Sequence, residues 1–208
     1  MEELTKINKL IDKRYELKGI AYENYKNLVT GLLAANKVTG PVQSEALIAY
    51  TKLNMYRMHR IEKTIQILPE IKTIVESITT SQKWLVLTEG WCGDAAQIIP
   101  VLNAMAVLNN NIQLLFLLRD ENPDLMDKYL SNGVSRSIPK LIVYNTSNNK
   151  ELFNWGPRPA EVQMKFDKMK QEGLPYDDIK EAIHSWYAKD HTFSIQREIS
   201  SLLASINV

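Results

Sequence analysis

Short apolar runs alternate with helical patterns along the second half of this chain. Residues 84–89 and 112–118 are apolar runs of strand length, and residues 93–109 between them place apolar side chains at helical spacing. Two more strands are expected near 140–145 and 150–155, and helices near 160–172 and from Asp177 onwards. This alternation is typical of an α/β domain built around a central sheet.

Residues before the break near Thr79 follow a helical pattern instead. A long helical stretch in one or two pieces is expected over 5–35, a second helix from about Ser44 to Leu68, and a third from Pro69. We therefore predict three parts. These are a helical N-terminal extension over 1–79, an α/β domain over 80–190, and a C-terminal amphipathic helix over 191–208.

The single cysteine, Cys92, lies where the strand expected over 84–89 gives way to a helix. Unpaired backbone N–H groups and the positive end of a helix dipole favour a thiolate there, although a lone cysteine is more often a small buried hydrophobe. The helix terminus contributes roughly 0.3–2 kcal/mol towards the anion. Asp94 opposes it by roughly 0.7 kcal/mol in water, or about 3 kcal/mol at an effective dielectric constant of 20, at a separation of about 6 Å. The sequence leaves the ionisation of Cys92 open.

Several short motifs resemble the thioredoxin superfamily. They are Trp91-Cys92-Gly93 at the start of the helix, Pro100 within it, Ile138-Pro139 before a strand, and Gly156 after the last strand. The resemblance covers about residues 80–190 and extends to a bacterial thioredoxin-like subgroup with a helical N-terminal extension and the motif Trp-Cys-Gly-Asp-Ala. It implies a thioredoxin-like fold, in which helices flank a central mixed sheet, and a cis-proline at Pro139. It further implies Cys92 as the catalytic nucleophile and a substrate-binding role for Trp91, Gly93, Asp94, Ile138 and Pro139.

Ala95 stands where the family carries its second cysteine. Because alanine cannot resolve a mixed disulfide, exchange at Cys92 should stop there until an outside thiol attacks. The resemblance therefore implies monothiol, redox-active thiol–disulfide exchange with a protein or a low-molecular-weight thiol or disulfide. The alternative is that the thiol chemistry is lost and the groove serves as a non-catalytic protein- or peptide-binding module. Whether the protein is an enzyme stays open.

Two arginines are candidates for tuning the thiol. The fold should bring Arg136 and Arg158 towards the cysteine end of the sheet, and we expect at least one to offset Asp94. Both are equally plausible as structural ion-pair partners. The three histidines are scattered, and none is expected near Cys92. No metal-site spacing and no glycine-rich nucleotide motif is present, so no metal and no cofactor are expected.

Charge and hydropathy exclude several partners. The formal net charge is +1, which gives no electrostatic case for nucleic acid or an anionic membrane. No apolar run approaches the roughly 20 residues that span a bilayer. The acidic and then amphipathic N-terminus is unlike a secretory signal, and a single cysteine suits a reducing compartment, so a cytoplasmic location is expected. The helical extension offers a surface through which the chain can form an oligomer.

Overall fold

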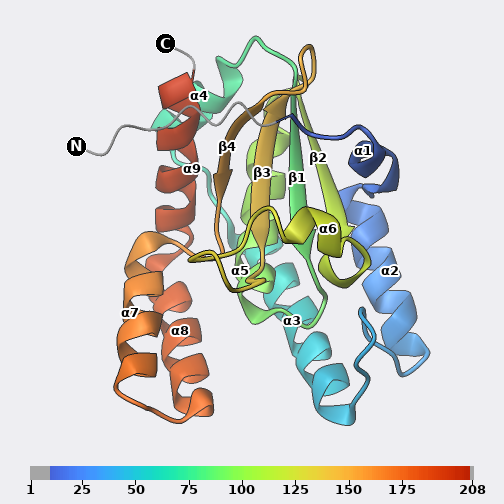
Figure 1. Ribbon diagram of the computed structural model, residues 1–208. Coiled ribbons are helices and arrows are strands. Elements are labelled where there is room, and N and C mark those ends of the chain that lie inside the picture. Colours follow the sequence, from blue (N-terminus) through green and yellow to red (C-terminus); the bar gives the residue numbers. More distant parts are fainter. Residues whose placement is uncertain (1–9, 207–208) are drawn as a thin grey trace.

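A mixed sheet of four strands forms the centre of the molecule, in the order β2-β1-β3-β4 (Figure 1). The computed structural model describes residues 10–206. The strands are β1 (Gln82–Thr88), β2 (Ile112–Leu118), β3 (Lys140–Asn145) and β4 (Glu151–Trp155). β1 runs parallel to β2 and antiparallel to β3, and β3 is antiparallel to β4. The α/β fold class with a central mixed sheet is confirmed.

The first two helices within residues 10–206 are α1 (Arg14–Lys18) and α2 (Tyr22–Ala34), which lie beside β2 (Figure 1). The stretch expected as helix over 5–35 is interrupted between them, and residues 5–9 lie outside the described residues. The interruption has a tertiary cause. Ile20 pairs with Phe116 of β2 through two backbone hydrogen bonds of 3.0 and 2.8 Å. This bridge covers part of a strand edge that would otherwise be open.

α3 (Glu45–Thr64) and α4 (Pro69–Glu76) complete the helices before the sheet. The Ser44 hydroxyl accepts a hydrogen bond from the Leu47 N–H at 3.2 Å, which is the usual way a serine begins a helix. α3 ends four residues earlier than the expected Leu68, because Ile65 is already extended. α3 packs against α5 (Gly93–Ala106), so the extension reaches the helix that Cys92 begins.

Five further helical segments follow β2. They are η1 (Arg119–Glu121), α6 (Pro123–Met126), α7 (Ala160–Gln171), α8 (Tyr176–Asp190) and α9 (Phe193–Ile206). In α8, Tyr187 is buried, and the neighbouring Trp186 donates its indole N–H to Glu161 at 2.8 Å. α9 packs against α4, so the amphipathic C-terminal helix covers the body of this chain.

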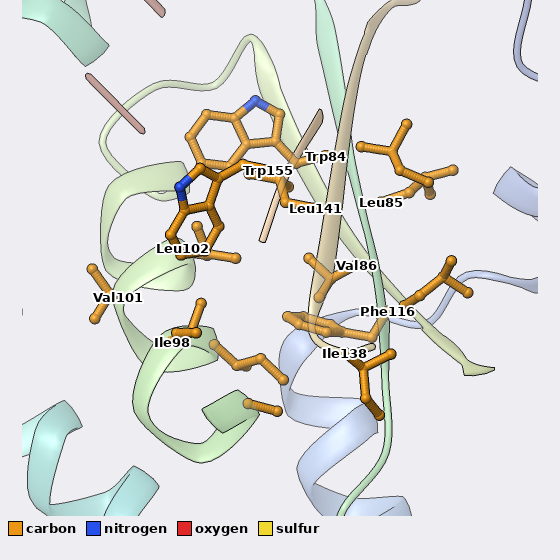
Figure 2. Packing of buried hydrophobic residues seen from close by; sticks show 14 of the residues in the cluster. Trp84, Leu85, Val86, Ile98, Val101, Leu102, Phe116, Ile138, Leu141 and Trp155 are labelled. Carbon is orange, nitrogen blue, oxygen red and sulfur yellow. The ribbon is translucent and has the colours of Figure 1, made fainter. Parts of the chain in front are cut away.

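α5 lies against the sheet in a continuous apolar core. Figure 2 shows Ile98 and Leu102 of α5 on the same side of the strands as the indole rings of Trp84 and Trp155. Trp84, Ile98 and Leu102 have no exposed surface. Burying an aliphatic side chain of this size stabilises a fold by roughly 1.5–3 kcal/mol. Because so much of α5 is buried, its N-terminus is held firmly at one end of the sheet.

Candidate functional site

Cys92 occupies the position just before the first turn of α5. Its Sγ accepts a hydrogen bond from the Ala95 N–H at 3.4 Å and donates one to the Ile138 carbonyl oxygen at 3.3 Å. The Ile138–Pro139 peptide bond is cis. The side chain of Cys92 is 8% exposed. Two segments far apart in the sequence therefore meet at the sulfur, one entering α5 and one entering β3.

The Cys92 thiol is protonated near neutral pH. Burial raises its pKa to about 12, and the charge of Asp94 adds to the rise. The Ala95 N–H and Arg158 act in the opposite direction. The sequence-based comparison of the helix terminus with Asp94 did not include burial, which has the largest effect on the pKa of Cys92. The hydrogen bond to Ile138 agrees, because only a protonated sulfur can donate to a carbonyl.

A buried cluster surrounds the Asp94 carboxylate. Arg158 forms an ion pair with it at 2.7 Å, and the Tyr187 hydroxyl donates to it at 3.0 Å. Burial raises the pKa of Asp94, and the Arg158 charge opposes that rise. The guanidinium of Arg158 also lies 4.1 Å from the centre of the Phe166 ring. The positive charge of Arg158 therefore mainly compensates Asp94 and only partly stabilises a thiolate at Cys92.

Arg136 pairs with a different carboxylate. Its guanidinium makes two hydrogen bonds of 2.7 Å with the carboxylate of Asp127, and both side chains are about half exposed. Of the two arginines considered from the sequence, the structure brings only Arg158 into contact with Asp94. Arg136 stays at the rim of the site.

A cleft of about 280 Å³ opens beside the cysteine. Its walls include five of the residues singled out from the resemblance, together with both arginines: Trp91, Cys92, Gly93, Asp94, Ile138, Arg136 and Arg158. Pro139 is not part of the wall, although its neighbour Ile138 is.

The loop before α3 holds the tryptophan at the edge of this cleft. The Trp91 indole N–H donates to the Thr39 carbonyl at 3.1 Å, and the Thr39 hydroxyl accepts from the Gly90 N–H at 2.9 Å. The Arg119 guanidinium lies 4.8 Å from the centre of the Trp91 indole. The helical extension thus shapes the turn that leads to Cys92.

Contrary to expectation, a histidine does lie next to the motif. A Cβ atom built on Gly93 would come within 2.3 Å of the Tyr50 hydroxyl and 2.9 Å of His184 Nε2. Tyr50 and His184 are themselves joined at 2.8 Å, and Gln97 Nε2 lies 3.3 Å from His184 Nδ1. Burial lowers the pKa of His184 to about 4, with nearby cations adding to the effect, so the ring is neutral at pH 7. A side chain at residue 93 would therefore require Tyr50 and His184 to move.

Neither Tyr50 nor His184 was singled out from the sequence. They lie 134 positions apart, on α3 and α8. The available signal was weak: His184 adjoins Ile183 on the inward face of α8. Within residues 10–206, no group of three or more His, Cys, Asp or Glu side chains is arranged to hold a metal ion, and no helix is long and apolar enough to cross a membrane.

The mixed sheet, with a cysteine at the start of α5 facing the residue before a cis-proline, defines a thioredoxin-like protein. A family model described as thioredoxin matches residues 40–170, which is more than half of the chain. The chain belongs to this thioredoxin family. The matched range includes α3 and α4 of the helical extension as well as the sheet.

Two solved structures resemble the chain in fold. A protein of unknown function from Pseudomonas aeruginosa has a TM-score of 0.55 at 16% identity, over 89% of this chain and 98% of that one. An HIV epitope scaffold has a TM-score of 0.55 at 15% identity, over 89% of this chain and 99% of that one. At such identities the likeness shows the fold alone. A search of curated proteins gives no match.

Proposed function

We propose that this protein carries out monothiol thiol–disulfide exchange at Cys92. The supporting observation is the contact of 3.3 Å between its sulfur and the Ile138 carbonyl, in the wall of a cleft. The contact supports the proposal because exchange at Cys92 would then occur beside the backbone expected to hold a substrate chain. Within residues 10–206 the Ile138 N–H makes no backbone hydrogen bond, and Ile138 lies in the cleft wall, so we propose that this N–H donates to the substrate chain.

The proposed exchange needs only one sulfur atom from the protein. The Cys92 thiol loses its proton, and the thiolate attacks one sulfur of a substrate disulfide. A bond forms between Cys92 and that sulfur while the second substrate sulfur leaves and takes up a proton. Ala95 offers no second thiol, so release requires an external thiol to attack the mixed disulfide. A reducing cytoplasm would supply that thiol, and we place the protein there.

The raised pKa sets the rate that the free protein should show. At pH 7.4 a thiol with a pKa of about 12 is ionised in about 2 molecules per 100,000, against about 7 per 100 for an ordinary cysteine. Nucleophilicity rises with pKa and recovers a factor of about 30. Exchange should therefore be about 100-fold slower than at an exposed cysteine. Productive exchange requires a substrate whose docking in the cleft replaces this lost reactivity.

The non-catalytic binding module remains a second candidate, supported by the same burial of Cys92. Incubation with a small disulfide followed by intact mass measurement separates the two. Exchange predicts one adduct on the native protein, formed about 100-fold more slowly than on the urea-unfolded chain and removed by an external thiol. A binding module predicts an adduct only after unfolding.

Ala95→Cys provides a matched gain-of-function variant. The Ala95 N–H lies 3.4 Å from Cys92 Sγ, so a thiol at residue 95 would be close to the mixed disulfide. In this variant the adduct should no longer accumulate, because the second thiol displaces the substrate and leaves an internal disulfide. An adduct that persists on folded Ala95→Cys would contradict the proposed geometry.

A further inference from the structure

Two cations lie against one aromatic ring between α3 and α8: Tyr50 and Lys180 are part of the cleft wall, and Arg57 lines an adjoining hollow. The Arg57 guanidinium lies 5.2 Å from the centre of the Tyr50 ring, and the Lys180 ammonium lies 5.1 Å from it. The hydroxyl of that ring contacts His184 beside Gly93. Both charges therefore flank the residue that packs against the neighbour of Cys92.

The counter-charges lie outside the cleft. Its wall contains four cations, Arg119, Arg136, Arg158 and Lys180, and one carboxylate, Asp94, which Arg158 already engages. Asp177, the partner of Lys180 at 2.8 Å, is 87% exposed, so that pair is weak. Arg57 donates to the neutral Asn54 amide oxygen at 2.9 Å and makes no ion pair within residues 10–206. Arg119 pairs with Asp120 and Arg136 with Asp127, so Arg57 and the weakly paired Lys180 have the most charge left for an entering negative group, although Asp177 and Glu181 line the same hollow.

We infer that the substrate disulfide carries a carboxylate near its sulfur, and that Arg57 and Lys180 bind this carboxylate. The inference rests on the proposed exchange at Cys92 and names its substrate class. Arg57 and Tyr50 come from α3, so the helical extension takes part in selecting the substrate. His184 is neutral, so it neither adds to nor cancels the attraction and instead holds the Tyr50 hydroxyl in place.

Three small disulfides of similar size test the inference: dithiodipropionate, its diamide and cystamine. For each disulfide, the rate of adduct formation on native protein is divided by the rate on urea-unfolded protein. This ratio corrects for the intrinsic reactivity of the disulfide. The diacid should exceed the diamide about tenfold at low salt, as two cations about 6 Å away predict. This ratio should fall towards one at about 1 M salt, where charges are screened beyond roughly 3 Å. Cystamine should react more slowly than the diamide.

Variants locate the effect. Arg57→Gln combined with Lys180→Gln should bring the ratio of diacid to diamide close to one. Arg60→Gln removes an exposed cation from the same helix, outside both the cleft wall and the hollow that Arg57 lines, and should leave the ratio as it is. A ratio of one in the wild type, or a ratio that survives the double substitution, would overturn the inference.

A peptide arm distinguishes the two sources of such a carboxylate. A disulfide-linked peptide dimer with Asp and Glu flanking its cysteine is compared with the Asn and Gln version. If the acidic peptide outpaces dithiodipropionate, the substrate is a protein segment; if not, it is a small acidic disulfide. Should no probe react natively, the exchange proposal fails. In that case, the binding of dithiodipropionate to the Cys92→Ser variant is measured by NMR to test the inference. If dithiodipropionate binds no more strongly than its diamide, the inference is overturned.

Discussion

Replacing Asp94 with asparagine should make Cys92 more reactive. Asp94 is buried, and its charge is the second largest cause of the raised pKa of Cys92, after burial itself. Asparagine keeps the side-chain shape and one oxygen for the Tyr187 hydroxyl, which now donates at 3.0 Å. The substitution removes a negative charge and leaves the Arg158 cation without its partner.

The size of the effect follows from Coulomb's law. A unit charge about 6 Å from the sulfur, at an effective dielectric constant of 20, contributes about 3 kcal/mol, or about 2 pKa units. The pKa of Cys92 should therefore fall from about 12 to roughly 10. At pH 8 the thiolate population rises about 100-fold, and its nucleophilicity falls by a factor of about 8. The net acceleration with a neutral disulfide should be about tenfold.

The assay is intact mass after reaction with a neutral disulfide between pH 7 and 10, with thiolate ultraviolet absorbance as a second readout. Breaking a buried ion pair can cost roughly 3–5 kcal/mol, so thermal unfolding must be followed in parallel. Arg158→Gln is the opposing variant: it removes an attractive charge and should slow the reaction, whereas loosening of the fold would accelerate both variants. Asp127→Asn, at an exposed carboxylate, should change nothing. An Asp94→Asn protein with the wild-type pH profile would refute the reasoning.

Three further outcomes are expected. Arg136→Ala should leave the thiol titration unchanged, because that guanidinium is bound to an exposed aspartate; a shifted curve would contradict this placement. His184 has a folded pKa of about 4 against about 6.5 unfolded, so the unfolded chain binds the extra proton and stability falls as pH drops through that window. The loss between pH 7 and 5 should be about 1–2 kcal/mol in urea unfolding, and His184→Gln should abolish it. Gly93→Ala should cost about 1–3 kcal/mol through its clash with the tyrosine hydroxyl of α3. Gly31→Ala, with nothing within 4 Å, should instead stabilise α2, and equal effects in both would refute the crowding argument.

The order of strands and helices could be predicted because the sheet is built from short apolar runs separated by turn residues. β2 has the predicted bounds of Ile112 to Leu118, and β3 and β4 lie where the sequence indicates them. A division of the helical stretch over 5–35 into two pieces was left open, but the position of the break between α1 and α2 could not be predicted, since it depends on the pairing of Ile20 with a distant strand. The local spacing of apolar residues gives no information about such a long-range contact.

The candidate site, like the fold, could be predicted from the sequence only in part. The position of Cys92 before a helix follows from its local pattern, and its approach to Ile138 follows the family resemblance. The burial that controls the pKa of Cys92 is a property of the packed molecule. The Tyr50–His184 contact joins two helices from opposite ends of the chain. Sequence spacing therefore identified Cys92 as the centre of the candidate site but missed much of its surroundings.

The two hydrogen bonds that Thr39 makes with Gly90 and Trp91 have a consequence for how the chain can be shortened. A fragment trimmed to the strands and their nearest helices would leave a buried amide and an indole nitrogen without acceptors, directly upstream of the sulfur. The smallest excised piece that keeps this bend intact must begin before residue 39.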